Sequence, residues 1–448
     1  MSKKVKKFTI LGGGGLGVIV PFLDMTFLPE TFSDVEFALY DVNLSKAELM
    51  ANFLRLLAKK RNFSASIKVY TKMEDAFAGT DFLLSRFRPG GSHTEQTGAG
   101  HVVDMNQWAN DLGYFADDTA APIATVMYLQ GISTTMKAVR ILEKVSPEAW
   151  FLNYTNPTQV LLDTVWRSSK IRAIGLCPGY LDSCYDISSI LGGKVRPDEI
   201  KVKAAGVNHN TFVYDCKIHG KDGFEYLREE FPSVQLHTLQ PFQLWGLDIF
   251  RETGYYPTPA GHMQPAFCNQ FLLDRVRAGL DAHWNRPLVR GFGDSGQKSF
   301  DLIRQYVEQN DIPANDKRIC DYENKPWTYS LEIDTAKALF SDETTELSLN
   351  LPNRGLLPDL PQDAIVEGPV QVSINQLEQV SVGRLNPKVI PVLKRLCDFA
   401  RYLNDSYMNQ DESLVLKALE AHPATSSLEQ AQITARESLK KASIPKLI

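Results

Sequence analysis

A short apolar segment that runs straight into a cluster of glycines constrains the fold of this chain more than any other feature. Residues 8–17 read FTILGGGGLG, in which Gly12, Gly14 and Gly17 fit the pattern GxGxxG between a predicted strand and a predicted helix. The first glycine of this pattern allows a tight turn, the second lets the backbone approach a pyrophosphate, and the third permits close packing of helix and strand. The N-terminus of the helix then faces the phosphates.

An acidic residue at the expected place indicates which dinucleotide the loop would bind. Asp41 closes the second predicted strand, where a carboxylate would bind ribose hydroxyl groups and disfavour a 2′-phosphate. The sequence therefore predicts an NAD site in preference to an NADP site. The alternative is a glycine turn that binds no ligand.

The pattern of apolar residues predicts an α/β fold. Strands are predicted at 7–11, 35–41, 67–70, 81–87, 149–155 and 171–177, and helices at 44–60, near 122–145 and from about Pro157 onward. This alternation favours a Rossmann-type, doubly wound parallel sheet. After about residue 195 the pattern changes to adjacent strands over 199–220, a turn at 219–223 and long helices from 386. We expect an NAD-binding Rossmann-like domain over 1–195 and a C-terminal substrate-binding, catalytic α/β domain over 196–448, with a shared core.

Composition and charge exclude several classes of partner. The 448 residues are 44% hydrophobic and 23% charged, with a net charge of -5, so neither nucleic acid nor an anionic membrane surface is expected as a partner. We find neither a signal segment nor an apolar stretch long enough to span a bilayer, and we expect a cytoplasmic protein. The six cysteines form no CxxC pair and are expected to be free thiols.

Polar residues gather where the predicted strands end. In doubly wound sheets, ligands bind outside the carboxyl ends of the strands. The residues in question lie in the segments SRFRPGG, NYTNP, GLCPGY and GVNHN, and they are Arg86, Arg88, Asn153, Thr155, Asn156, Cys177, Asn208 and His209.

One pair among them suggests a metal site. Cys177 and His209 both end strand-like segments, 32 residues apart, and a thiolate with an imidazole could bind Mn²⁺, Zn²⁺ or Fe²⁺. The alternatives are a buried cysteine that acts as a small apolar residue and a histidine with ordinary polar partners. Two ligands are fewer than a closed metal site needs.

Two further segments carry candidate catalytic groups. The segment GYYPTPAGHMQPAF at 254–267 contains Tyr256 and His262, and the run LGYFADDTAAP places Asp117 and Asp118 before a long predicted helix. A loop of the first kind suits a substrate-facing segment, although it could equally be a surface turn. Asp118 alone reads more simply as a helix cap.

Taken together, these segments resemble glycoside hydrolase family 4, the NAD- and metal-dependent glycosidases. The resemblance covers nearly the whole chain and also includes the block NLPNRG…LPQDAIVEGP at 350–369. It implies a lactate/malate-dehydrogenase-like Rossmann domain followed by an α/β domain, and a homodimer or homotetramer.

The resemblance also implies roles for individual residues. Cys177 and His209 would hold Mn²⁺ or another divalent metal, Asp118 would assist departure of the leaving group, and the base would be His262 or Tyr256. The expected cofactor-binding residues are Gly12, Gly14, Gly15, Leu16, Gly17, Asp41 and Arg86. The expected substrate-binding residues are Arg88, Asn153, Asn156 and Asn208.

The implied reaction is hydrolysis without net oxidation. NAD⁺ would take a hydride from C3 of the sugar, and the resulting ketone would acidify the C2 proton while the metal stabilises the enediolate. A base would remove that proton, the C1 substituent would be eliminated, water would add, and the hydride would return to C3. Such enzymes differ from glycosidases that use two carboxylates.

The sequence departs from the family pattern at three loops. These are DDTAAPIA in place of a glycine-rich run, Pro178 where an Asn or His usually follows the metal cysteine, and Ala266 where an acidic residue is common. The absence of Asn after Cys177 favours an unphosphorylated or uronic-acid glycoside. The alternatives are a 6-phospho-α- or β-glucosidase, an NAD-dependent sugar or hydroxy-acid dehydrogenase, and a sugar or nucleotide sensor without activity.

Overall fold

The computed structural model describes residues 4–89, 108–109, 111–114, 117, 119–230, 239–260, 296–313, 316 and 330–442. Two of the predicted catalytic residues, Asp118 and His262, lie outside these residues.

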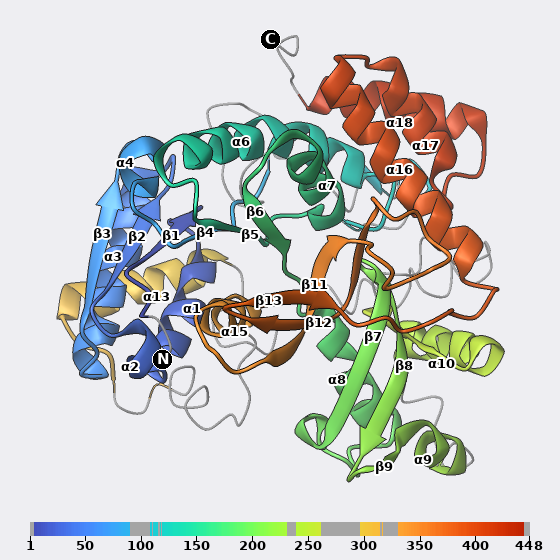
Figure 1. Ribbon diagram of the computed structural model, residues 1–448, viewed down its shortest axis with the longest axis horizontal. Helices are drawn as coiled ribbons and strands as arrows, with labels where there is room; N and C mark the ends of the chain where they lie inside the picture. Colours follow the sequence, from blue (N-terminus) through green and yellow to red (C-terminus); the bar gives the residue numbers. More distant parts are fainter. Residues whose placement is uncertain are drawn as a thin grey trace.

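The described strands join in one mixed sheet of 13 strands (Figure 1). Along its main path the order is β10-β8-β7-β12-β11-β6-β5-β4-β1-β2-β3, with β13 beside β12 and β9 beside β8. The strands are β1 (Lys7–Leu11), β2 (Val35–Tyr40), β3 (Ala65–Tyr70), β4 (Phe82–Ser85), β5 (Trp150–Asn153), β6 (Arg172–Gly175), β7 (Ile200–Val207), β8 (Asn210–Ile218), β9 (Lys221–Asp222), β10 (Tyr256–Thr258), β11 (Thr345–Pro352), β12 (Ile365–Ser373) and β13 (Gln376–Gln379).

Strands β1 to β6 form the parallel part of the sheet. Their order, β3-β2-β1-β4-β5-β6, is that of a dinucleotide-binding Rossmann fold. The predicted α/β class and Rossmann-type sheet are therefore confirmed. The strand ends were predicted too late, because β5 and β6 stop at Asn153 and Gly175. Cys177 consequently lies two residues beyond its strand.

The remaining strands are antiparallel and extend the same sheet. β11 meets β6 through the pair Asn350 and Gly175, and β12 meets β7 through the pair Glu367 and Gly206. β7 and β8 form a long hairpin that extends away from the parallel strands (Figure 1). The sheet thus continues across residue 195, and the expected division into two domains stays a prediction. Part of the predicted turn at 219–223 is the short strand β9.

Helices cover both faces of the sheet. They are α1 (Ile19–Thr26), α2 (Pro29–Phe32), α3 (Leu44–Lys60), α4 (Met73–Phe77), α6 (Ala124–Val145), α7 (Thr158–Ser168), α8 (Asp182–Ile190), α9 (Gly223–Glu230), α10 (Pro241–Thr253), α13 (Gly296–Gln309), α15 (Leu331–Leu339), α16 (Ile390–Asn409), α17 (Ser413–Ala421) and α18 (Leu428–Lys441), with 3₁₀ turns η1 (Leu16–Val18), η2 (Gly179–Leu181) and η3 (Pro197–Glu199). None of the helices in the described segments is long and apolar enough to cross a membrane.

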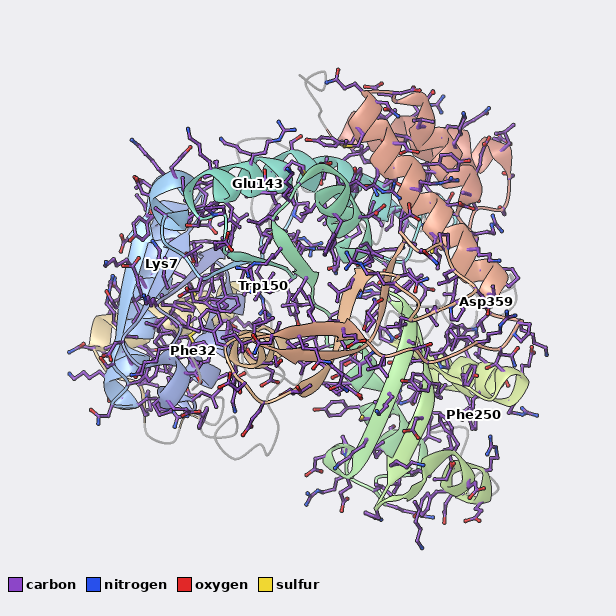
Figure 2. The ribbon with its side chains drawn as sticks, in the orientation of Figure 1. Lys7, Phe32, Glu143, Trp150, Phe250 and Asp359 are labelled. Carbon is purple, nitrogen blue, oxygen red and sulfur yellow. The ribbon has the colours of Figure 1, made fainter. Side chains whose placement is uncertain are left out.

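Alternation along the parallel strands divides the core between the two faces. Phe82 and Leu84 of β4 pack with α1, α2, α3, α13 and α15, whereas Leu83 packs with α4, α6, α7 and α16 to α18. Both faces are therefore apolar, as a parallel sheet with helices on each side requires. A third cluster, which includes Phe212 of β8 and Phe250 of α10, fills the half that carries the hairpin. Figure 2 shows Phe32 in the half formed by β1 to β3 and Phe250 in the hairpin half.

A row of polar residues interrupts the face that α7 covers. Lateral pairing aligns Ser85, Asn153, Gly175, Asn350 and Glu367 across five neighbouring strands. We call these five residues the polar row. Its four side chains are at most 1% exposed, and a Cβ on the glycine would lie 2.9 Å from Leu162 and Thr158 of α7. The carboxyl ends of β4 to β6 therefore present buried polar groups next to the first turn of α7.

A buried histidine ties the C-terminal helices to the segment before α6. The His422 Nε2 atom lies 3.0 Å from the carbonyl oxygen of Ala120, and its Nδ1 atom accepts the amide hydrogen of Ala424 at 3.1 Å. Burial, helped by the charge of Arg395, lowers the pKa of His422 to about 3. The ring is thus neutral, and its Nε2–H donates to Ala120.

This histidine predicts a loss of stability in acid. The pKa of His422 falls from 6.5 to about 3 on folding. The stability that the neutral ring contributes is therefore fully present above pH 6.5 and is lost as the pH falls from 6.5 toward 3. The slope is about 1.4 kcal/mol per pH unit. Urea unfolding of the unchanged protein should therefore lose about 2 to 3 kcal/mol more between pH 6.5 and 4.5 than unfolding of His422→Gln. Equal pH dependence of the two proteins would contradict this assignment.

Candidate active site

Two glycines of the loop after β1, Gly12 and Gly17, pack too closely against their neighbours to admit a side chain. Gly12 has a φ of 100°, and a Cβ there would lie 2.7 Å from the carbonyl oxygen of Arg86. A Cβ on Gly17 would lie 2.6 Å from the Arg86 Nε atom. Around Gly15, by contrast, the nearest atom to a built Cβ is the Gly12 carbonyl oxygen at 3.5 Å. The loop is therefore packed tightly at Gly12 and Gly17 and open at Gly15. A pyrophosphate-binding loop needs such an opening.

Asp41 closes this loop from the end of β2. One of its carboxylate oxygens accepts the amide hydrogen of Gly14 at 2.9 Å, and the other accepts that of Asn43 at 2.8 Å. Each oxygen keeps a second acceptor site that a ribose hydroxyl could use. Leu16 packs against the apolar core below the loop. The residues present fit a dinucleotide.

Arg86 follows β4, and two side chains hold it. Its Nη1 atom lies 2.5 Å from Glu332 of α15, and its guanidinium lies 4.4 Å from the centre of the Tyr154 ring. Glu332 is only 1% exposed. Arg86 thus forms a wall of the glycine loop. Sequence reasoning missed Glu332, because nothing near residue 332 signals a partner 246 positions earlier.

Cys177 lies in the turn after β6 and is 8% exposed. A Cβ on Gly179 would lie 3.2 Å from both the Cys177 sulfur and Pro259, so only glycine fits there comfortably. The Thr258 hydroxyl donates to the carbonyl oxygens of Gly179 and Tyr180, at 3.0 Å and 3.2 Å. Strand β10 thus holds the cysteine turn in place. Cys177, Cys184, Cys216 and Cys397 are all buried free thiols.

His209 occupies the turn of the β7–β8 hairpin with a φ of 59°. Its Nδ1 atom lies 3.6 Å from the Asp117 carboxylate, which accepts the amide hydrogens of Thr119 at 2.9 Å and of Ala120. Burial opposes a charge on the ring, but the negative charge of Cys177 and the Asp117 carboxylate outweigh it and raise the pKa of His209 well above 6.5. The fold therefore brings Cys177 and His209 together, as the spacing of their strands suggested.

Asp117 adds a feature that is common around metal-binding histidines. Such a histidine usually donates its second ring N–H to a carboxylate, which fixes the ring and leaves the other nitrogen for the metal. Asp117 lies 3.6 Å from Nδ1, which is longer than a hydrogen bond, so it meets this side of the ring as a charge contact. The sequence predicts a role for its neighbour Asp118 and offers no reason to prefer Asp117.

The donor set fits a divalent metal with open positions. A thiolate and an imidazole suit Mn²⁺, Fe²⁺ or Zn²⁺. No group of three or more His, Cys, Asp or Glu residues that could hold a metal occurs among the described residues. Cys177 and His209 would therefore leave several coordination positions for oxygen atoms of other molecules.

Buried asparagine oxygens lie near this pair. Asn153 and Asn208 are at most 1% exposed, and each uses its NH₂ group within the protein: Asn153 donates to Thr155 O at 3.0 Å and Asn208 to Glu367 at 2.7 Å. Their Oδ1 atoms have no hydrogen-bond partner in the described parts of the chain. Such acceptors suit a ligand rich in hydroxyl groups.

The other two predicted substrate-binding residues, Asn156 and Arg88, are less buried. Asn156 is half-buried and accepts a hydrogen bond from the Thr158 hydroxyl at 3.2 Å, beside a cis bond to Pro157. Arg88 is exposed.

Tyr256 lies away from these groups. It is fully buried in the core of the hairpin half, where a Cβ on Gly246 of α10 would lie 2.8 Å from its hydroxyl. Burial and the nearby Asp186 carboxylate raise the pKa of Tyr256 well above 10. This position argues against direct contact with a substrate, and its predicted catalytic role stays a prediction.

Glu367 is a further carboxylate that sequence reasoning missed. It accepts hydrogen bonds from Asn208 at 2.7 Å and Asn350 at 3.4 Å. Burial raises its pKa to about 7, although Asn208, His209 and Asn350 favour the ionised form. The segment 350–369 belongs to the family resemblance, but no local signal indicates that Glu367 lies close enough to His209 to interact with it electrostatically.

Comparison with known proteins identifies the family. The model of the family 4 glycosyl hydrolases matches residues 7–191, and that of the family 4 C-terminal domain matches residues 204–425. The chain belongs to glycoside hydrolase family 4. It is therefore a glycoside hydrolase.

Relatives in this family act on several kinds of sugar. The chain is 25% identical to an α-galactosidase of Bacillus subtilis, over 87% of this chain and 86% of the relative. It is 23% identical to an α-galacturonidase of Lachnoclostridium phytofermentans, over 93% of this chain and 91% of the relative. It is also 23% identical to a 6-phospho-β-glucosidase of Escherichia coli, over 98% and 95%.

Solved structures share the fold. A 6-phospho-α-glucosidase from gut microorganisms, in complex with NAD and glucose-6-phosphate, matches with a TM-score of 0.80 and 17% identity over 98% of both chains. A second such enzyme, in complex with NAD and Mn²⁺, matches with a TM-score of 0.77 and 15% identity over 98% of both chains. A lactate dehydrogenase from a deep-sea metagenome library matches with a TM-score of 0.53 and 14% identity, over 90% of this chain and 98% of that chain.

The Arg86–Glu332 pair predicts a measurable coupling between the glycine loop and α15. Removing one partner leaves the other charge buried or half-buried without compensation. A double-mutant cycle of Arg86→Met and Glu332→Gln, measured by urea unfolding, should give a coupling energy of about 1 to 3 kcal/mol. The exposed pair Arg304 and Asp301, at 3.2 Å, serves as the control and should show almost none. Equal coupling in the two cycles would contradict a structural role for the first pair.

Proposed function

We propose that this chain hydrolyses the O-glycosidic bond of an unphosphorylated or uronic-acid hexoside, with no net oxidation. The observation that carries the proposal is the meeting of Cys177 and His209 beside the sheet edge that also carries the glycine loop. A dehydrogenase that works without a metal would need the loop but not this pair. Family membership supports hydrolysis, and relatives with α-galactosidase and α-galacturonidase names support the substrate class.

Two cofactors follow from the donor groups. The glycine loop and Asp41 would hold NAD, and Cys177 with His209 would hold Mn²⁺ or another divalent metal, in keeping with relatives solved with NAD and Mn²⁺. When bound, the dinucleotide would supply a hydride acceptor and donor, and the metal would supply a Lewis acid for the oxygens of the sugar.

The residues of the chain then have distinct tasks. Asp117, 3.6 Å from Nδ1, would help to fix the orientation of the His209 ring that holds the metal. The buried oxygens of Asn153 and Asn208 accept hydrogen bonds from sugar hydroxyls. Asp118 would assist departure of the leaving group and His262 would serve as the base. These two roles rest on the resemblance.

Phosphate recognition has weaker support than recognition of a neutral sugar or a carboxylate. Arg86 already pairs with Glu332 and stacks on Tyr154. Of the two arginines in the segment SRFRPGG, Arg88 is the exposed one. The 6-phosphoglucosidases among the relatives keep that substrate as the second candidate.

A panel of substrates tests the proposal. Protein with NAD⁺, Mn²⁺ and a reductant is given nitrophenyl α- and β-glycosides, their 6-phosphates and uronides. We expect release of nitrophenol from an unphosphorylated glycoside or a uronide without accumulation of NADH, and loss of deuterium from C2 to solvent. The Cys177→Ser variant should lose most activity and bound metal, whereas Cys397→Ser, a buried thiol on α16, should keep both.

Each other outcome favours a different function. Steady accumulation of NADH would indicate a dehydrogenase, and sugar binding without cleavage would indicate a sensor. Cleavage of 6-phosphates alone would overturn the proposed substrate class. Full activity of Cys177→Ser would remove the assigned metal site.

The open space at Gly15 predicts a separation of stability from cofactor binding. A methyl group at Gly15 has room in the protein itself but would enter the proposed pyrophosphate position. Gly15→Ala should therefore keep its urea midpoint and lose at least about 10-fold in NAD⁺ affinity, measured by calorimetric titration. Gly12→Ala should lower stability, because Gly12 has a φ of 100°. Unchanged NAD⁺ affinity in Gly15→Ala would contradict the placement of the dinucleotide.

A further inference from the structure

Glu367 lies where the two halves of the sheet meet. It pairs laterally with Asn350 of β11 and Gly206 of β7, and it is 1% exposed. Its Oε2 atom accepts the NH₂ group of Asn208 at 2.7 Å and that of Asn350 at 3.4 Å. One carboxylate oxygen thus holds two amide groups, from the hairpin turn and from the central strand.

This arrangement decides which end of each amide remains available. An asparagine side chain has a donating NH₂ group and an accepting oxygen at opposite ends. The NH₂ groups of Asn208 and Asn350 both point at Glu367 Oε2, so the carboxyl group takes the donors and leaves the amide oxygens. The Oδ1 atoms of Asn208 and Asn350 are buried and have no hydrogen-bond partner among the described residues.

Asn153, in the same polar row, also uses its NH₂ group inside the protein, but with a different partner. Its NH₂ group is taken by the Thr155 carbonyl oxygen, and its Oδ1 atom also lacks a partner in the described part of the chain. Unpartnered buried acceptors are costly and are usually satisfied by water, an ion or a ligand. A sugar offers hydroxyl groups that can donate to them.

We propose that Glu367 is a positioning residue of the sugar site: it holds the NH₂ group of Asn208 and thereby turns the Asn208 amide oxygen toward a hydroxyl group of the substrate. Asn350 strengthens this hold as the second amide on the same oxygen. The inference rests on the proposed function, since it assumes that the ligand of this site is a sugar.

The chain offers a matched control for a purely structural carboxylate. Asp163 of α7 is 3% exposed and also accepts the NH₂ group of an asparagine, Asn404 of α16. This second pair ties two helices together and presents no amide to the proposed site. Loss of Asp163 should therefore lower stability alone, whereas loss of Glu367 should also lower sugar affinity.

The test compares three variants with the unchanged protein. Binding of galactose, galacturonate and glucose, with NAD⁺ and Mn²⁺ present, is measured by calorimetry, together with kcat and KM on the cleaved glycoside. Glu367→Met, which removes the acceptor at similar volume, should weaken sugar affinity by about 10-fold or more. Glu367→Gln keeps one acceptor oxygen and should stay within about 3-fold of the unchanged protein. Asp163→Leu should bind sugar normally.

A double variant tests whether Glu367 acts through Asn208. Glu367→Met combined with Asn208→Leu should bind sugar no more weakly than Asn208→Leu alone, because both changes remove the same contact. Additive losses would overturn the proposal, as would unchanged sugar affinity in Glu367→Met. If that variant does not fold, Glu367→Asp, which withdraws the carboxylate by one methylene group, replaces it with the same expectation.

Failure of the proposed function looks different. In that case the unchanged protein would neither cleave a glycoside nor bind a sugar, and the role assigned to Glu367 would fall with it. If the unchanged protein cleaves and binds while Glu367→Met equals it, only the positioning role is wrong.

Discussion

Backbone hydrogen bonding between β6, β11, β12 and β7 is the constraint on which the proposed site depends. Cys177 follows β6, and His209 turns the hairpin that begins with β7, so neither neighbours the other along the chain or within one strand pair. Two strands from beyond residue 344 fill the space between them and fix their relative position. The joins to the outer strands each rest on one residue pair, at Gly175 and Gly206. The dinucleotide loop and the proposed metal ligands thereby belong to one continuous sheet.

This arrangement of strands brings several buried polar groups close together. Asp117, His209 and Glu367 are each at most 8% exposed, and burial works against their charged forms. The structure offsets this by mutual contacts: Asp117 beside His209, and Glu367 beneath Asn208. Among the described residues, the buried amide oxygens of Asn153, Asn208 and Asn350 have no hydrogen-bond partner, and such acceptors suit a polyhydroxylated ligand. Bound sugar and metal would therefore complete the hydrogen bonding of the fold as well as the reaction centre.

Local sequence signals were sufficient for the parallel part of the fold. The spacing of apolar residues and glycines correctly predicted the Rossmann-type sheet and the loop at Gly12, and chain order alone suggested that Cys177 and His209 meet. The supporting residues escaped prediction because they act across the sheet. Glu332 reaches Arg86 from 246 positions away, and Glu367 reaches Asn208 from 159 positions away. Neither an ion pair to a helix nor a strand register over such a range leaves a trace in a single sequence.

X-ray absorption spectroscopy of the Mn²⁺-loaded protein tests the central claim, that Cys177 and His209 jointly hold the metal. The fold places one thiol and one imidazole at this point and no third His, Cys, Asp or Glu ligand among the described residues. We therefore expect one sulfur and one nitrogen neighbour from the protein, with oxygen atoms in the remaining positions, and loss of the sulfur contribution in Cys177→Ser. A coordination shell made of oxygen alone in the unchanged protein would contradict the account.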